Sequence, residues 1–154
     1  MNASRPVDVL VVGLGPAGST AAAAAASAGL SVLAIERKQQ IGVPVQCAEY
    51  IPLPIGKYAQ VAGVLQQRIA GMTSCLPSGT ETHSALPGLM VDRAAFDQAL
   101  AQQAAAQGAE LKCETRLLRI DTQRQCAVVN THCRNHIELS DFNRCRWPAF
   151  QRGG

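Results

Sequence analysis

The chain has 154 residues, enough for one modest domain, with a net charge of +3 and only 4 % aromatic residues. Its basic residues are scattered rather than clustered, so we expect no nucleic-acid-binding surface. Six cysteines in a sequence rich in glycine and alanine, with no secretion signal, favour reduced thiols and a cytoplasmic protein over a disulfide framework.

The apolar start of the chain has some features of a signal peptide or a membrane span. Asp8 and the Gly-Leu-Gly-Pro-Ala-Gly sequence at residues 13–18 interrupt it, and neither kind of segment tolerates such a turn at its centre. We therefore expect no transmembrane segment, while peripheral contact with a membrane stays open.

Residues 8–36 have the pattern of one βαβ unit. The β-branched run at 7–12 predicts a buried strand, and the alanine-rich segment that ends at Gly29 predicts a helix. A second apolar run at 31–35 predicts a parallel strand, and Glu36 follows it directly.

The glycines of this unit point to a dinucleotide. Gly13 permits a sharp turn, Gly15 lets the backbone approach a pyrophosphate, and Gly18 allows close packing of helix on strand. Pro16 suits the first helical turn, whose free amides and dipole attract a diphosphate. An acid at the position of Glu36 would bind the hydroxyls of the adenosine ribose.

The middle of the chain reads as an insertion. Residues 41–54 have no helical period and predict an ordered loop, while residues 60–69 predict a short helix stopped by Gly71. Weak alternation over residues 72–90, around a Pro-Ser-Gly turn, predicts a β-hairpin.

The chain then returns to the parallel sheet. Asp92 is a predicted N-cap for a helix over residues 93–107, and residues 110–117 predict a strand. The fold class is therefore α/β, with a parallel sheet and a Rossmann-like dinucleotide-binding unit; the family resemblance given below implies an FAD/NAD(P)-binding domain that is incomplete. We place the domain at residues 1–120, with 50–90 as an insertion toward a substrate domain.

Residues 121–154 differ in composition and show no periodicity beyond a hint of a strand at Val128 and Val129. We expect an irregular or disordered tail, which would fit a frameshifted or out-of-family ending. The tail contains possible metal ligands but not the paired Cys-x2-Cys spacing of zinc sites, so no metal is predicted; these are Cys126, His132, Cys133, His136 and Cys145.

Three motifs in order give a family resemblance: the glycine fingerprint, IGVPVQCAEY at 41–50 and VDRAAFDQAL at 91–100. Over residues 8–120 the chain resembles the N-terminal part of the geranylgeranyl reductase family of FAD-dependent oxidoreductases, which belong with the p-hydroxybenzoate hydroxylase-like flavoproteins. The resemblance implies reduction of isoprenoid double bonds by a flavin hydride, with NAD(P)H as electron donor and a lipid-like or other small-molecule substrate.

The resemblance also implies which residues hold FAD. The diphosphate would lie on Gly13, Gly15, Pro16, Ala17 and Gly18, and the ribose on Glu36, with Arg37 beside it. Arg93 would reach back to the ribityl or phosphate region, and Leu117 would offer its backbone to the adenine. Cys47 and Ala48 would run beside the isoalloxazine; no catalytic residue is assigned.

Two departures from the family pattern matter. The family's Cys-Gly-Glu-Gly loop here reads Cys47-Ala48-Glu49-Tyr50, so the contact with the flavin would change. The later Ala-Asp-Gly and Gly-Asp motifs are absent, which indicates a fragment with an uncovered apolar surface around Ile35, Leu118 and Ile120. A flavin-dependent aromatic hydroxylase and a non-catalytic nucleotide-binding fragment remain as alternatives.

Overall fold

The computed structural model of the chain describes residues 6–121, 126–130 and 135–138. Its centre is a parallel sheet of order β1-β2-β8, formed by Val9–Val12, Val32–Ile35 and Glu110–Lys112. Helix α1, Pro16–Ser27, connects the first two strands. The predicted βαβ unit and its parallel register are confirmed.

Strand β2 is buried on both faces, and its side chains divide between two layers. Val32 and Ala34 pack with α1 and Ala104 of the second helix. Leu33 and Ile35 point the other way, to Val129. This alternation with period two places the sheet between a helical layer and a second β-layer.

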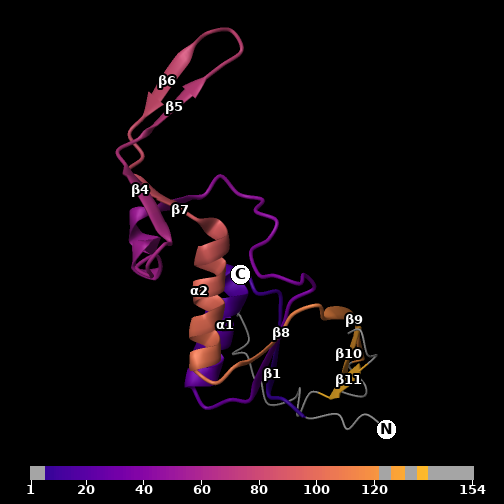
Figure 1. Cartoon of the computed structure of the whole chain (residues 1–154). Helices are drawn as coiled ribbons and strands as arrows, with labels where there is room; N and C mark the ends of the chain where they lie inside the picture. Colours follow the sequence, from indigo (N-terminus) through magenta and orange to yellow (C-terminus); the bar gives the residue numbers. More distant parts are fainter. Residues whose placement is uncertain (1–5, 122–125, 131–134, 139–154) are drawn as a thin grey trace, which may run out of the picture.

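Helix α2, Arg93–Ala106, runs alongside α1 on the helical side of the sheet (Figure 1). Asp92 caps it, accepting a hydrogen bond of 2.8 Å from the amide of Ala95, as predicted. Phe96 and Leu100 are buried on its inner face, which fixes the helix against its neighbours.

The insertion contains two small sheets. In one, β7 (Gly88–Val91) pairs antiparallel with β3 (Tyr50–Pro52) and with β4 (Leu65–Ile69), and the short 3₁₀ helix η1 (Leu53–Tyr58) follows β3. In the other, β5 (Met72–Cys75) and β6 (Glu81–Ser84) form the predicted hairpin, which projects away from the helices (Figure 1).

The predicted helix over residues 60–69 is wrong. Residues 65–69 form β4, whose backbone pairs with β7, and Gly63 before it has a positive φ of 84°. Pairing with a strand some twenty residues further along the chain overrides the weak helical preference of this short stretch, since propensity is a weak prior beside tertiary contacts.

The single strand predicted over residues 110–117 is divided in two. Glu114 has a positive φ of 51° and Thr115 is buried, so the chain leaves the parallel sheet after β8. It then enters β9, Arg116–Asp121. Backbone bonds from the amides of Glu114 and Thr115 to the carbonyls of Lys38 and Glu36 fix the change of direction.

The region expected to be irregular contains strands among its described residues. Strand β10 (Cys126–Asn130) pairs antiparallel with β9 and with β11 (Asn135–Glu138), forming a layer beside the parallel sheet (Figure 1). This layer covers Ile35, which is 1 % exposed, whereas Leu118 and Ile120 are 58 % and 52 % exposed. The prediction of an uncovered surface was therefore wrong for Ile35.

Other predictions for this region are not tested. His132, Cys133 and Cys145 lie outside the described residues, and the domain boundary after residue 120 stays a prediction. Within the parts of the chain that are described, no helix has the length and apolar character needed to cross a membrane.

Candidate functional site

The turn between β1 and α1 is built around its glycines. Gly13 has a positive φ of 95° and donates its amide to the carbonyl of Ile35 at 2.7 Å. A Cβ on Gly18 would lie 1.9 Å from the carbonyl oxygen of Gly13, so a side chain there would force helix and turn apart. A Cβ on Gly15 would meet nothing within 4 Å. Gly18 is thus required for packing, while the space at Gly15 is open to a ligand.

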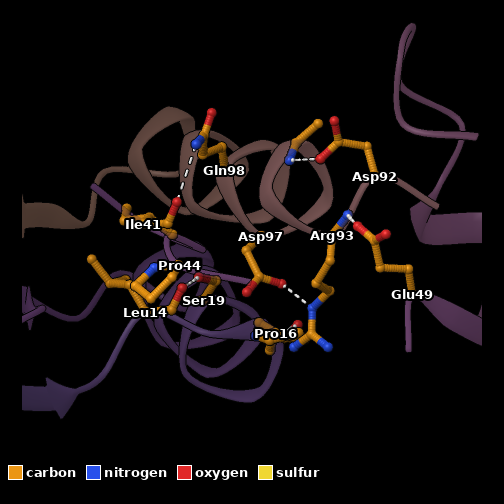
Figure 2. A network of polar contacts seen from close by, with 12 residues as sticks. Leu14, Pro16, Ser19, Ile41, Pro44, Glu49, Asp92, Arg93, Asp97 and Gln98 are labelled. Carbon is orange, nitrogen blue, oxygen red and sulfur yellow. Dashed lines mark hydrogen bonds and ion pairs between the residues drawn. The ribbon is translucent and has the colours of Figure 1, made fainter. Parts of the chain in front are cut away.

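The free end of α1 presents amides to that space. Gly15 is the N-cap with an extended backbone, Pro16 is the first helical residue, and no side chain caps the helix. Ser19 is buried and donates its hydroxyl to the carbonyl of Leu14 at 3.2 Å, which holds the turn (Figure 2). An anion at this end would meet unpaired amides and the positive end of the helix dipole.

Glu36 joins the two halves of the βαβ unit. Its Oε2 accepts the amide of Leu14 and its Oε1 the amide of Lys38, each at 3.0 Å. The half-buried carboxylate therefore lies at the glycine turn, as the spacing predicted. Its contact with a ribose stays a prediction.

Arg93 opens α2 and is held by Asp97 one turn later. The Nε of Arg93 lies 2.7 Å from Oδ1 of Asp97, and the two side chains are 26 % and 9 % exposed (Figure 2). The hydrogen bond to Asp97 is the main cause that raises the pKa of Arg93, with a smaller contribution in the same direction from Cys47. Because Asp97 occupies Nε, the two terminal nitrogens of a permanently charged guanidinium are left for other partners.

These elements enclose a polar cavity of about 190 Å³. Four predicted site residues border it: Gly15, Glu36, Cys47 and Arg93. They come from four places in the chain and meet because the sheet brings β1 and β2 together while α2 packs beside α1. The other lining residues are Leu14, Lys38, Gly42, Pro44, Val45, Gln46 and Asp97.

The remaining predicted residues lie elsewhere. Arg37 and Ala48 are exposed and do not border the polar cavity. Leu117 is in β9, opposite Val129, where it packs toward the core between the two β-layers. Pro16 and Ala17 border a neighbouring groove. The roles assigned to all these residues by resemblance remain predictions.

That groove is apolar, with a volume of about 590 Å³. It is bordered by residues of α1 and α2 and by Ile51, Ile55 and Tyr58 from the insertion. Arg93 borders both the groove and the polar cavity. The charged side chain of Arg93 therefore lies between the polar cavity and the apolar groove.

Sequence reasoning missed Lys38, Gly42 and Asp97 as site residues. Lys38 is half-buried at the cavity, with its amide on Glu36. A Cβ on Gly42, which has a positive φ of 79°, would lie 2.8 Å from Cα of Ala94, so the loop touches the first turn of α2. The signal for Asp97 was its spacing, since an acid four residues after Arg93 shares its helix face.

Tyr50, one of the departures from the family loop, lies away from the cavity. Its ring covers Gly88 on the paired strand β7, where a Cβ would come within 2.2 Å of a ring carbon. The bulky side chain is accommodated by this glycine, and it does not border the polar cavity.

The parallel sheet, the glycine turn and the polar cavity at its carboxyl end are typical of a Rossmann-like, dinucleotide-binding fold. The match to the family of FAD dependent oxidoreductases spans residues 8–140, and the chain belongs to this family. The match continues beyond residue 120, where the resemblance seen in the sequence ended.

Two relatives show which members of this family the chain is similar to. A protein from Methanosarcina barkeri, described as an uncharacterized protein in the nifH2 5′ region, is 40 % identical over 127 residues, covering 74 % of this chain and 68 % of that protein. The digeranylgeranylglycerophospholipid reductase of Methanosarcina acetivorans is 41 % identical over 117 residues, covering 71 % of this chain and 29 % of the reductase.

A solved structure supports the similarity to geranylgeranyl reductases. The crystal structure of a geranylgeranyl bacteriochlorophyll reductase-like protein from Thermoplasma acidophilum superposes with a TM-score of 0.77 at 29 % identity, covering 89 % of this chain and 38 % of that one. The resemblance to geranylgeranyl reductases is confirmed. The chain spans less than a third of the length of the Methanosarcina acetivorans reductase.

Proposed function

We propose that this chain supplies the part of an FAD site that binds the adenosine diphosphate half of the cofactor, in an oxidoreductase of the geranylgeranyl reductase type. The observation that carries the proposal is the polar cavity where Gly15, Glu36 and Arg93 meet. It brings a carboxylate and a guanidinium to the glycine turn that leads into the uncapped start of α1, an arrangement that suits a pyrophosphate linked to a ribose.

Each of these residues has a distinct task. The open space at Gly15 lets a pyrophosphate come close to the amides at the start of α1. Arg93, held at Nε by Asp97, directs its remaining donors to phosphate oxygens. Each carboxylate oxygen of Glu36 accepts one backbone amide and keeps further lone pairs, which can accept hydrogen bonds from ribose hydroxyls.

When bound, FAD supplies hydride chemistry, and the relatives' names make an isoprenoid double bond the proposed acceptor, with NAD(P)H as the donor. The protein would position the cofactor and exclude water rather than carry the reaction itself. A lipid-like substrate is consistent with peripheral contact with a membrane. A cytoplasmic location belongs to the same proposal.

The competing proposal is a nucleotide-binding fragment without activity. The 117 residues aligned with the Methanosarcina acetivorans reductase cover 29 % of its length, which makes the activity of the whole enzyme a proposal for this chain. The two proposals differ in a simple observation. A yellow preparation that oxidises NAD(P)H supports the enzyme, whereas a colourless one that binds ADP supports the fragment.

Calorimetric titration of the full chain with ADP and with FAD tests the site. We expect Arg93→Ala to weaken ADP binding roughly tenfold, as for the loss of a hydrogen bond to a charged group. The matched control is Arg68→Ala, which removes one cation from the exposed strand β4, away from the cavity. Absence of ADP and FAD binding, or equal affinity in both variants, would reject the proposed function.

A further inference from the structure

One wall of the polar cavity has no regular secondary structure. Residues 43–48 are exposed, and Pro44, Val45, Gln46 and Cys47 all border the cavity. The contacts within this wall are weak ones: Val43 donates its amide to the carbonyl of Gln40 at 3.4 Å, Lys38 Nζ lies 3.5 Å from the carbonyl of Pro44, and Cys47 contacts Arg93. The position of the wall therefore depends mainly on how its ends are attached.

The upstream end is attached to α2. Gln98 donates its Nε2 to the carbonyl of Ile41 at 3.1 Å, one helical turn beyond Ala94, which touches Gly42 (Figure 2). Because any side chain at residue 42 would collide with the helix backbone, this end of the wall is fixed in place by shape as well as by a hydrogen bond.

The downstream end is attached to the same helix by Glu49. Its carbonyl accepts the amide of Val91 at 2.8 Å. Its Oε1 accepts the amide of Arg93 at 3.1 Å (Figure 2). The carboxylate thus accepts a hydrogen bond from one of the amides at the start of α2 that have no partner within the helix, at the end where the helix dipole favours an anion.

Glu49 holds this position in a conformation that favours glycine. Its φ is +60°, in the left-handed region that residues with a side chain seldom adopt. Such a conformation persists only where the surroundings determine it, and it is frequent at functional sites. The contacts of Glu49 with Val91 and Arg93 are the surroundings that determine it here.

Asp92 provides an internal comparison. It also places a carboxylate on a first-turn amide of α2, that of Ala95 at 2.8 Å. Asp92 belongs to the chain that enters the helix, and it does not border the cavity or adjoin residues 43–48. The two acids therefore make the same kind of helix cap, but only that of Glu49 also ties down the cavity wall.

We infer that Glu49 is a positioning residue: its carboxylate fixes the segment 43–48 to the first turn of α2 and so holds Cys47 at the cavity beside Arg93. The inference deepens the proposed function and rests on it as far as the ligand is concerned. The placement of the wall itself can be measured without any ligand.

The test uses the full chain with a nitroxide spin label on Cys47 and the other five cysteines replaced by serine. In the parent protein we expect an immobilised spectrum. Glu49→Ala should mobilise the label, while Asp92→Ala, the matched loss of a helix cap, should leave it immobilised. Glu49→Gln, which keeps an oxygen acceptor, should restore most of the immobilisation.

Ligand affinity is the second measurement, made on the unlabelled chain. Glu49→Ala should weaken ADP binding roughly tenfold, because the wall beside Arg93 is no longer held, and Asp92→Ala should not. If Glu49→Ala does not fold, Glu49→Gly removes the same carboxylate while tolerating the positive φ.

The outcomes separate the two proposals. If both acids affect the label equally, or neither does, Glu49 is an ordinary helix cap and the inference is wrong. If the parent chain binds no ADP, the proposed function fails, and the spectra of the labelled variants still decide the role of Glu49.

Discussion

Gly15 and Gly18 are three residues apart, yet substitutions at the two positions should affect different properties. A side chain at residue 18 should lower stability, whereas one at residue 15 should lower ligand affinity. At Gly18 an added Cβ would lie 1.9 Å from a backbone oxygen, so Gly18→Ala should lower the free energy of unfolding by about 1–3 kcal/mol or more. At Gly15 an added Cβ meets nothing within 4 Å. The backbone there is extended, so Gly15→Val should cost only about 1 kcal/mol, through the poorer N-cap.

Ligand binding should follow a different order from stability. A branched side chain at residue 15 would fill the space in front of the first amides of α1. Losing two hydrogen bonds to a charged phosphate, each worth about 1.5–3 kcal/mol, removes at least about 3 kcal/mol of binding free energy. This corresponds to a loss of ADP affinity of roughly a hundredfold or more.

The assay pairs urea denaturation with calorimetric titration of ADP. Gly15→Ala should fall between the parent and Gly15→Val in affinity, with nearly unchanged stability. Unchanged ADP affinity in Gly15→Val would refute the placement of the pyrophosphate, and a loss of stability as large as that of Gly18→Ala would refute the open space.

Two further predictions concern the glycine turn and its neighbourhood. Glu36→Ala should weaken ADP binding by roughly 1–3 kcal/mol and also lower stability, since the carboxylate holds the amides of Leu14 and Lys38; unaltered affinity in titration would contradict a ribose contact. Desolvation, followed by the charges of Glu36 and Glu114, raises the pKa of Cys113, so its alkylation should rise at higher pH than that of a cysteine in an unstructured peptide. The same shift leaves stability unchanged below the ordinary thiol pKa and lowers it as pH rises from there through the raised pKa.

The features that could be predicted are those determined by nearby residues. The βαβ unit and the helix capped by Asp92 combine periodicity with matching start and stop signals, so each local preference agrees with the final fold. The hairpin at residues 72–84 follows from its turn sequence in the same way.

The errors arose where distant pairing decides the structure. Residues 65–69 become a strand because β7 supplies partners, and Ile35 is covered because β10 lies across the parallel sheet. Neither contact leaves a periodic signal in its own segment.

The same distinction between local and distant determinants holds for the residues of the site. The glycines, Glu36 and Arg93 belong to motifs and were recognised, whereas the roles of Gly42 and Glu49 depend on contact with α2 about fifty residues later. Arg37 and Leu117 were assigned by resemblance alone, and the structure places neither at the polar cavity.

Asp97 offers a last prediction, which separates the charge of the Arg93 pair from its geometry. The acid is nearly buried and contacts Nε of Arg93 at 2.7 Å. Asp97→Asn keeps an oxygen at the same place and removes a negative charge from the edge of an anion site. ADP affinity should therefore stay within roughly threefold of the parent, while stability falls by about 1–2 kcal/mol through the weaker hydrogen bond.

Asp97→Ala removes the acceptor altogether, so the guanidinium loses the contact that directs its terminal nitrogens. ADP affinity should then fall roughly tenfold, because a long and flexible side chain must be ordered by the ligand itself. Titration of both variants, below their melting temperatures, distinguishes the two effects. If Asp97→Ala binds ADP as tightly as Asp97→Asn does, the orientation of Arg93 does not depend on Asp97, and the order of Arg93 must come from its contact with Cys47 or from the ligand.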